Sequence, residues 1–149
     1  MALTELIGTD LGTQTIRIEQ GPVRAFASAV KDDPARYTGD QANTPPTWPF
    51  VMSYWGSSGT GGAAGLPMDK LRGPGRIMLH GEQEFEYSRA PQVGETLTGT
   101  GSISDVYERE TTSAFMEFYV REMNWRDESG NAVVTERFTL IVRRKKESG

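Results

Sequence analysis

The second half of the chain carries four successive segments in which apolar and polar residues alternate. They span residues 77–88, 96–108, 113–126 and 132–144. Alternation with a period of two is typical of strands that cover one face of a sheet. The last two segments flank a turn in which Gly130 suits the left-handed position. Four long strands in succession predict an antiparallel sheet, and the rest of the chain must pack against it.

The alternation also predicts which side chains share a face of each strand. In 77–88 one face takes Ile77, Leu79, Phe85 and Tyr87, and the other takes Met78, His80, Glu82, Glu84 and Glu86. In 96–108 one face takes Leu97, Gly99, Gly101 and Ile103, until Val106 breaks the phase. This break predicts a bulge near Asp105. In 113–126 one face takes Ala114, Met116, Phe118 and Val120. Glu117 and Arg121 lie on the second face, which Phe115, Tyr119, Met123 and Trp125 partly cover.

The first half of the chain predicts smaller elements. Residues 13–20 read as a short strand with Ile16 and Ile18 on one face. A helix is expected over 22–31, with Pro22 at its first position and an apolar stripe that starts at Val23. Residues 48–55 suit a short buried helix with Pro49 in its first turn. The predicted class is α+β, a curved antiparallel sheet packed on a short helix.

Length and composition narrow the possible functions. A chain of 149 residues predicts one domain over 1–149, with a segment of flexible composition at 56–65. The net charge of −4 argues against nucleic acid and anionic membranes as partners. The absence of cysteine excludes disulfides, thiolate zinc sites and iron–sulfur clusters. With no signal-peptide pattern and no long apolar run, we expect a cytoplasmic protein.

Several residues suggest chemistry, and each has a plainer interpretation. His80, the single histidine, has Glu82 two residues away as a possible partner for general-base chemistry, but a structural histidine is favoured. The three glutamates of 82–86 suit a metal or a solvated face, and the solvated face is favoured. The basic run 143–146 suits ligand phosphates or a solvated tail. The glycine-rich stretch 59–64 resembles a dinucleotide loop without the helix such a loop needs, so no cofactor is expected. With one histidine and no cysteine, no metal site is expected either.

Three stretches together resemble a known family. Residues 79–110 contain LHGEQ followed by a turn that reads Pro91-Gln-Val-Gly-Glu-Thr-Leu97. This combination resembles the N-terminal half-domain of MaoC-like dehydratases. PPTWPF at 45–50 and the VRAFASAVKDDPARY run at 23–37 resemble two further family segments. The resemblance covers about residues 5–144.

The resemblance implies a hotdog fold, in which a long antiparallel sheet wraps around a central helix and two such units pair into a double hotdog. It also implies an acyl-CoA thioester as ligand, bound between the two halves. In the active half of these enzymes an Asp and a His on one loop hydrate or dehydrate the thioester-conjugated double bond. A role in fatty acid metabolism follows from the same resemblance.

The chain departs from the family at that loop. Lys31 stands at the position of the Asp and Arg36 at the position of the His. A one-residue gap restores Asp32 as the acid, but no gap supplies a histidine. The expected function is therefore that of the non-catalytic half of an enoyl-CoA hydratase. The chain would complete the acyl-CoA tunnel while a partner chain with the Asp/His pair performs the chemistry.

Two alternatives stay open from the sequence. One is a self-sufficient homodimeric hotdog thioesterase or hydratase that uses His80, and the other is an acyl-CoA-binding module without catalysis. For the first interpretation we expect no catalytic residue in this chain beyond a minor role for His80 as an orienting group. The residues predicted to contact the ligand are Trp48, Phe50 and Tyr54 on the acyl side, His80, and Arg76 and Arg143 at the CoA phosphates. The identity of the acyl group is not predicted.

Overall fold

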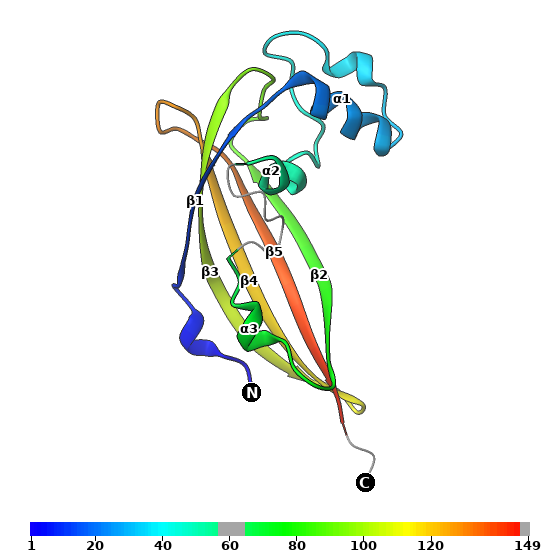
Figure 1. The fold of residues 1–149 in the computed structure, drawn as a ribbon, viewed down its shortest axis with the longest axis vertical. Helices are drawn as coiled ribbons and strands as arrows, with labels where there is room; N and C mark the ends of the chain where they lie inside the picture. The colour runs from blue at the N-terminus through cyan, green and yellow to red at the C-terminus, as the bar shows by residue number, and fades with distance from the viewer. Residues whose placement is uncertain (57–64, 147–149) are drawn as a thin grey trace.

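Five strands form one antiparallel sheet in the computed structural model, which describes residues 1–56 and 65–146 (Figure 1). The strands are β1 (Asp10–Arg17), β2 (Arg76–Tyr87), β3 (Thr96–Glu110), β4 (Ala114–Arg126) and β5 (Ala132–Lys145). Their order across the sheet is β1-β3-β4-β5-β2, so β1 and β2 are the two edges. The four long strands predicted by alternation are confirmed. Residues 57–64, which hold most of the predicted glycine-rich segment and the dinucleotide-like motif, lie outside the described residues.

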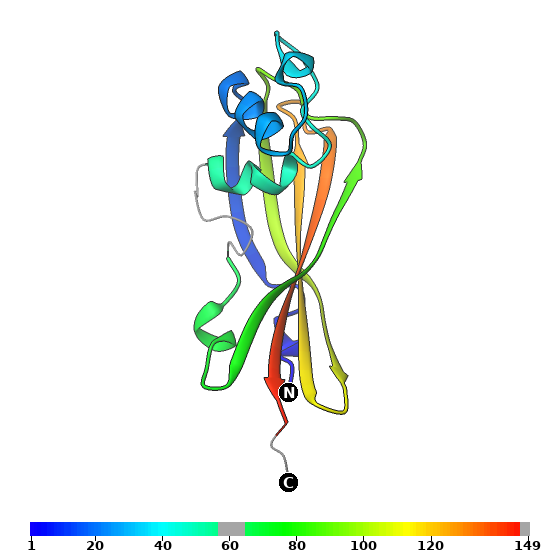
Figure 2. The ribbon, with the colours of Figure 1, turned by 90° about the vertical axis from the view of Figure 1, so that its right-hand side faces the viewer.

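The helical elements are short and lie on one side of the sheet. They are η1 (Thr4–Leu6), α1 (Gln20–Ala29), η2 (Pro34–Tyr37), α2 (Pro49–Trp55) and α3 (Met68–Leu71). α2 contacts β1 and β5 and crosses the upper half of the sheet, with α1 and η2 above it and α3 near the lower end (Figures 1 and 2). We call the face of the sheet beneath α2 and α3 the inner face. The predicted α+β class is confirmed.

The core lies between the inner face and these helices. Around α1 and α2 the buried side chains include Ile16, Ile18, Val23, Trp48 and Met52. A second cluster near α3 includes Leu71, Ile103, Tyr119, Leu140 and Val142. Burial of Ile16 and Ile18 confirms the shared face predicted for the first strand, although β1 starts and ends three residues earlier than predicted.

The start of α1 differs from the sequence prediction, whereas α2 agrees with it. The first helix begins at Gln20, two residues before the predicted start, so Pro22 is its third residue rather than its first. The backbone N–H groups of a helix's first turn have no partner within the helix, which is why proline is tolerated there as well. The predicted helix with Pro49 in its first turn is confirmed as α2, and Met52 and Ser53 are its fully buried residues.

The predicted bulge near Asp105 is confirmed. The pairing of β3 with β4 shifts between Ile103 and Asp105, and Val106 is buried on the inner face together with Ile103. A β-bulge adds one residue to a strand and so restores an apolar side chain to the covered face.

The prediction that Ile77 and Leu79 share a face of β2 with Phe85 and Tyr87 is wrong. The pairing of β2 with β5 shifts between His80 and Glu82, which makes Gly81 a second bulge. His80 pairs with Leu140 and Phe85 with Glu136, so both face inward, whereas Leu79 pairs with Ile141 on the outer face. A one-residue shift exchanges the two faces of a strand. Ile77 and Leu79 therefore share the outer face with the glutamates, 52% and 44% exposed.

In β4 the two faces are as predicted, and the second face, predicted to be partly covered, is largely buried. The face with Glu117 and Arg121 is the inner one, where Tyr119, Met123 and Trp125 are also buried. Burial places both charged side chains beneath the helices rather than in solvent. Charged groups in such positions need partners, because burial without a partner costs several kcal/mol.

Gly99 is required by the packing of this core. A Cβ at position 99 would lie 2.8 Å from Cε3 of the Trp125 ring, and Trp125 is itself buried. We expect Gly99→Ala to lower the free energy of unfolding by about 1–3 kcal/mol, as overpacked cores do. Urea denaturation measures this. The matched control is Gly21→Ala in α1, where nothing lies within 4 Å of the added Cβ. An alanine at 99 that leaves stability unchanged would contradict this packing.

Candidate functional site

An apolar groove lies where α1 and α2 meet the edge strand β2. Its volume is about 480 Å³, and it is lined by Phe26 and Val30 of α1, Thr47 and Phe50 at the start of α2, and Gln83 and Phe85 of β2. Four of these six side chains are apolar. Pockets of 300–1,000 Å³ with mostly apolar walls are typical of small-molecule sites. The groove is thus suited to an extended apolar ligand.

His80 lies beside this groove without a carboxylate partner. Its ring stacks on Phe50 with centroids 5.7 Å apart and meets Phe138 edge-on at 4.5 Å. The bulge at Gly81 places Glu82 on the opposite face of β2, so the predicted His80–Glu82 pair does not form. Among the described residues, the His80 side chain makes no hydrogen bond or ion pair. The contacts of its side chain are with the aromatic rings of Phe50 and Phe138.

The three aromatic residues predicted on the acyl side have different environments. Phe50 lines the groove. Trp48 is 1% exposed and packs edge-on against Phe26 at 5.7 Å, so it belongs to the core. Tyr54 is 52% exposed, and its ring centroid lies 6.0 Å from that of Phe50. It is not among the residues that line the groove. The structure brings Phe50 and His80 together and separates the other two from the groove walls.

The two arginines predicted at CoA phosphates lie on opposite faces of the sheet. Arg76 pairs with Arg144 on the inner side, donates to the Leu71 carbonyl at 3.2 Å and lies 3.6 Å from Glu117. It is four residues along β2 from His80, roughly 13 Å at the rise of an extended strand. Arg143 pairs with Ile77 on the outer face, away from the groove. Only Arg76 shares a face with Phe50 and His80.

The loop after α1 holds the residues at the family's catalytic positions. Lys31 has a positive φ of 60° and begins the turn. Asp32 accepts a hydrogen bond from the Tyr37 hydroxyl and another from Arg36 at 3.1 Å. The Tyr37 hydrogen bond, the Asp33 backbone N–H and Arg36 together lower the pKa of Asp32 below its ordinary value. Asp32 is thus a carboxylate held by its own loop, which suits it poorly to accept and return protons near neutral pH.

A polar triad that the sequence patterns did not reveal consists of Gln83, which lines the groove, and the buried residues Glu136 and Arg121. Gln83 Nε2 donates to Glu136 Oε1 at 2.9 Å, and Arg121 Nη2 donates to the same oxygen at 3.2 Å. Arg121 and Glu136 are both fully buried. Burial raises the pKa of Glu136 and lowers that of Arg121, and the attraction between the two charges opposes both shifts. The signal in the sequence is a charged residue at an alternating inner position of each of two neighbouring strands.

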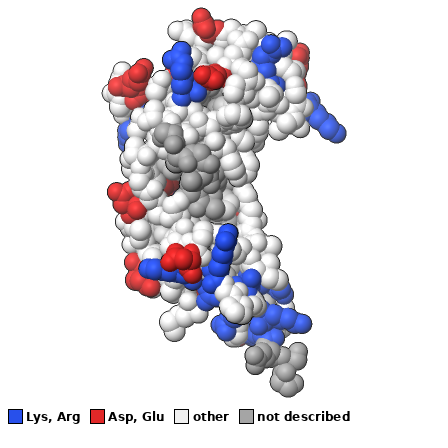
Figure 3. Space-filling view, viewed as in Figure 1, with Lys and Arg blue, Asp and Glu red and all other residues white. Residues whose placement is uncertain are grey.

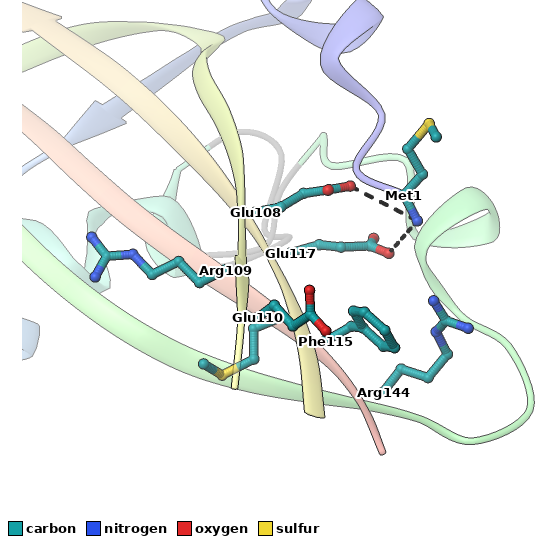
Figure 4. A pocket seen from close by; sticks show the side chains of 8 residues that line it. Met1, Glu108, Arg109, Glu110, Phe115, Glu117 and Arg144 are labelled. Carbon is teal, nitrogen blue, oxygen red and sulfur yellow. Dashed lines mark hydrogen bonds and ion pairs between the residues drawn. The ribbon is translucent and has the colours of Figure 1, made fainter. Parts of the chain in front are cut away.

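A second pocket of about 280 Å³ lies at the other end of the sheet (Figure 4). Its lining mixes charges of both signs, and the Met1 amino group reaches Glu117 at 3.4 Å and Glu108 at 3.9 Å. Phe115 lies below Arg144, whose guanidinium is 5.1 Å from the ring centroid. Lysine and arginine side chains gather around this end, where β5 finishes with the basic run 143–146 (Figure 3). In this pocket positive and negative groups pair with one another, whereas the groove beside α1 and α2 has mostly apolar walls.

Two further properties concern metals and membranes. In the parts of the chain that the structure describes, no three His, Cys, Asp or Glu side chains gather in a way that would hold a metal ion. Within those same ranges, no helix has the length and apolar character needed to cross a bilayer.

The sheet order and the helix lying across its inner face define the class of the protein. They match solved structures of hotdog proteins. The ChsH1–ChsH2 complex of Mycobacterium tuberculosis gives a TM-score of 0.69 at 17% identity, covering 94% of this chain and 87% of that one. The HadBC (3R-hydroxyacyl-ACP dehydratase) complex of the same organism gives 0.64 at 19% identity, covering 93% and 98%. The predicted hotdog fold is confirmed.

Sequence comparison then identifies the family. A family model described as the FAS1-like dehydratase domain region matches residues 5–136. The UPF0336 protein of Thermobifida fusca is 32% identical over 138 residues, which are 85% of this chain and 84% of that protein. This chain belongs to the FAS1-like dehydratase region family. The resemblance to dehydratase-type hotdog domains predicted from the sequence is confirmed at this level.

Proposed function

We propose that this chain is the non-catalytic half of a heteromeric enoyl-thioester hydratase or dehydratase. In this proposal it completes the acyl-binding channel, and a partner chain supplies the Asp/His pair. Membership of a dehydratase family supports the reaction class. Two of the structures that share the fold are complexes of two named chains, which supports a heteromeric assembly.

The observation that carries the proposal is the state of the loop at residues 31–37. Its carboxylate, Asp32, is engaged by Tyr37 and Arg36, and the loop contains no imidazole. The chain's single histidine, His80, stacks on Phe50 on another element instead. Hydration of a conjugated double bond needs a group that moves protons near neutral pH, and histidine is the side chain suited to this. The proton-transfer groups would therefore come from another chain.

The groove supports an acyl thioester as the ligand. Its walls at Phe26, Phe50 and Phe85 suit the hydrocarbon part of an acyl chain. Arg76, on the same face of the sheet, is the remaining candidate for the phosphates of a CoA or carrier-borne thioester. Arg143 is a weaker candidate because it lies on the outer face.

The free edge of β2 supports pairing with a second hotdog chain. β2 is an edge strand of twelve residues, and its outer face exposes Ile77 and Leu79. Long exposed edge strands with apolar side chains tend to pair with another strand. Pairing at β2 would also enclose the groove, since Gln83 and Phe85 of this strand form one of its walls.

The test is hydration of trans-2-decenoyl-CoA by this chain alone and mixed with a MaoC-domain protein encoded nearby. We expect the mixture to be at least about 100-fold faster, the lower end of what general acid–base groups contribute. Arg36→Ala in this chain serves as a control and should leave the rate of the mixture unchanged. Hydration by the chain alone at the rate of the mixture would overturn the proposal.

One observation favours a second candidate, a homodimeric hydratase or thioesterase that uses His80. The imidazole is exposed at the groove next to Phe50. If the chain alone is active and His80→Ala abolishes that activity, this candidate replaces the first. Binding of acyl-CoA without turnover in any mixture would instead indicate an acyl-CoA-binding module.

A further inference from the structure

The apolar groove has a polar floor. Gln83 and Thr47 are the two polar side chains among its lining residues, and Gln83 donates to the buried Glu136, which also accepts from the buried Arg121. Resting on the proposed acyl-binding function, we propose that Gln83, oriented by Glu136 and Arg121, selects acyl chains that carry a hydroxyl group outside the reacting carbons. In this role Gln83 is a specificity-determining residue that contacts the ligand, and the other two are positioning residues.

The hydrogen bonds fix which way the Gln83 amide points. Glu136 Oε1 accepts from both Gln83 Nε2 and Arg121 Nη2, at 2.9 and 3.2 Å. A carboxylate oxygen paired with an arginine only accepts hydrogen bonds, so the amide nitrogen of Gln83 must face it. The amide oxygen Oε1 is then turned away from Glu136. A group that satisfies Oε1 has to donate a hydrogen, which a hydroxyl does and a ketone or methylene does not.

Unpartnered polar atoms concentrate at this place. In the described part of the chain, seven buried side-chain nitrogen or oxygen atoms lack a hydrogen-bond partner. Three of the seven are Gln83 Oε1 and Arg121 Nε and Nη1, whereas a hydrogen bond from the Trp125 side chain lowers the pKa of Glu136. Buried polar atoms in native proteins are nearly always hydrogen-bonded, so three such atoms in one place need an explanation. A ligand hydroxyl that reaches Gln83 supplies one for Gln83 Oε1, the atom among these that belongs to a groove-lining residue.

Fold stability alone does not account for the triad. Well-packed apolar residues in place of a buried ion pair are often neutral or stabilising. Leu140 and Val142 on the same inner face of β5 illustrate that apolar side chains fit there. A glutamine that faces both an apolar groove and a buried ion pair is instead suited to recognising one polar atom on an otherwise apolar ligand. Sites built to hydrogen-bond a substrate hydroxyl discriminate against analogues that lack it.

The experiment measures the affinity of the full chain for decanoyl-CoA and for its hydroxylated isomers at carbons 6 to 10, by calorimetry, alone and with the catalytic partner. We expect at least one hydroxylated isomer to bind about tenfold more tightly than decanoyl-CoA, and the corresponding oxo compound to show no such gain. Gln83→Leu should remove the preference, so that decanoyl-CoA and the hydroxylated isomer bind this variant with affinities within about twofold of each other. Gln83→Met, which is unbranched, provides the second variant should the leucine variant be unstable in a thermal melt.

Thr47→Val is the matched control, because it removes the other polar group of the groove without touching the triad. The preference for the hydroxylated isomer should survive in this variant. Equal binding of all isomers to the wild type, or a preference that persists in both Gln83 variants, would overturn the inference while leaving the acyl-binding function in place. Failure of every acyl-CoA to bind, alone and with the partner, would instead refute the proposed function, and the inference would be rejected with it.

Discussion

Arg121→Met is expected to lower the free energy of unfolding by about 3–5 kcal/mol, the range found when one partner of a buried ion pair is removed. Arg121 and Glu136 are both fully buried, and Arg121 Nη2 lies 3.2 Å from Glu136 Oε1. Methionine fills a similar volume, so the loss comes mainly from the charge left on Glu136 without its partner. Urea denaturation at neutral pH measures the effect. Arg126→Met on the same strand is the control, since Arg126 is exposed and should change stability by no more than about 0.5 kcal/mol.

The penalty for Arg121→Met is expected to depend on pH. Burial already raises the pKa of Glu136, and Arg121 opposes that shift. Without Arg121 the folded-state pKa rises further, so the folded protein keeps a proton that the unfolded chain releases above about pH 4.3. Stability must then fall as pH rises from about 4.3 through the raised pKa. The penalty should be smaller at pH 4.5 than at pH 7.5, and a penalty equal at both would contradict a charged Glu136.

A double variant separates the lost charge pair from lost packing. Arg121→Met combined with Glu136→Leu removes both charges and should recover most of the lost stability, since apolar replacements of buried ion pairs are often neutral or stabilising. If the double variant is less stable than Arg121→Met alone, packing rather than the uncompensated charge accounts for the loss.

Trp48→Ala is expected to lower the free energy of unfolding by about 3–5 kcal/mol, as for other buried tryptophans. The side chain is 1% exposed, packs edge-on against Phe26, and lies in the cluster that joins α1 to α2. Chemical denaturation followed by far-UV circular dichroism tests this. Tyr54→Ala is the control, because Tyr54 is 52% exposed and its truncation should cost little.

Comparison with Phe50→Ala distinguishes a core residue from a ligand contact. Phe50 is partly exposed and lines the groove, so its truncation should weaken decanoyl-CoA binding about tenfold with a smaller loss of stability than at Trp48. If Trp48→Ala folds as stably as the wild type but loses decanoyl-CoA binding, Trp48 is a ligand contact, as the sequence analysis expected.

The two bulges illustrate which details of the sheet the sequence reveals. The bulge near Asp105 was predictable because Val106 is the apolar residue that falls out of phase in an otherwise regular segment. The bulge at Gly81 was not, because residues on both sides of it alternate regularly and the pattern before it, Ile77 and Leu79, is apolar on what becomes the outer face. A glycine between two regular stretches is compatible with either register until the neighbouring strand is in place.

In the candidate site, too, the sequence revealed some features and left others to the tertiary structure. Phe50 could be assigned to a short helix beside the ligand from the sequence, and the loop without an imidazole could be identified through the family resemblance. The pairing of Arg121 with Glu136 could not, because the two residues are fifteen positions apart on strands whose buried faces both contain apolar and charged residues. Trp48 and Phe50 are two residues apart at the start of α2, and only the tertiary packing decides that Trp48 is buried against Phe26 while Phe50 lines the groove.

The sequence by itself determined the period of each strand, the short helices, the family resemblance and the absence of a histidine at residues 31–37. These follow from local preferences and from residue identity. The tertiary structure decided which face of β4 is buried, that His80 faces Phe50 rather than Glu82, and that a groove forms between α1, α2 and β2. A period of two determines which residues share a face, but not which face is covered. That depends on helices and strands distant in the sequence, whose packing removes one face from water.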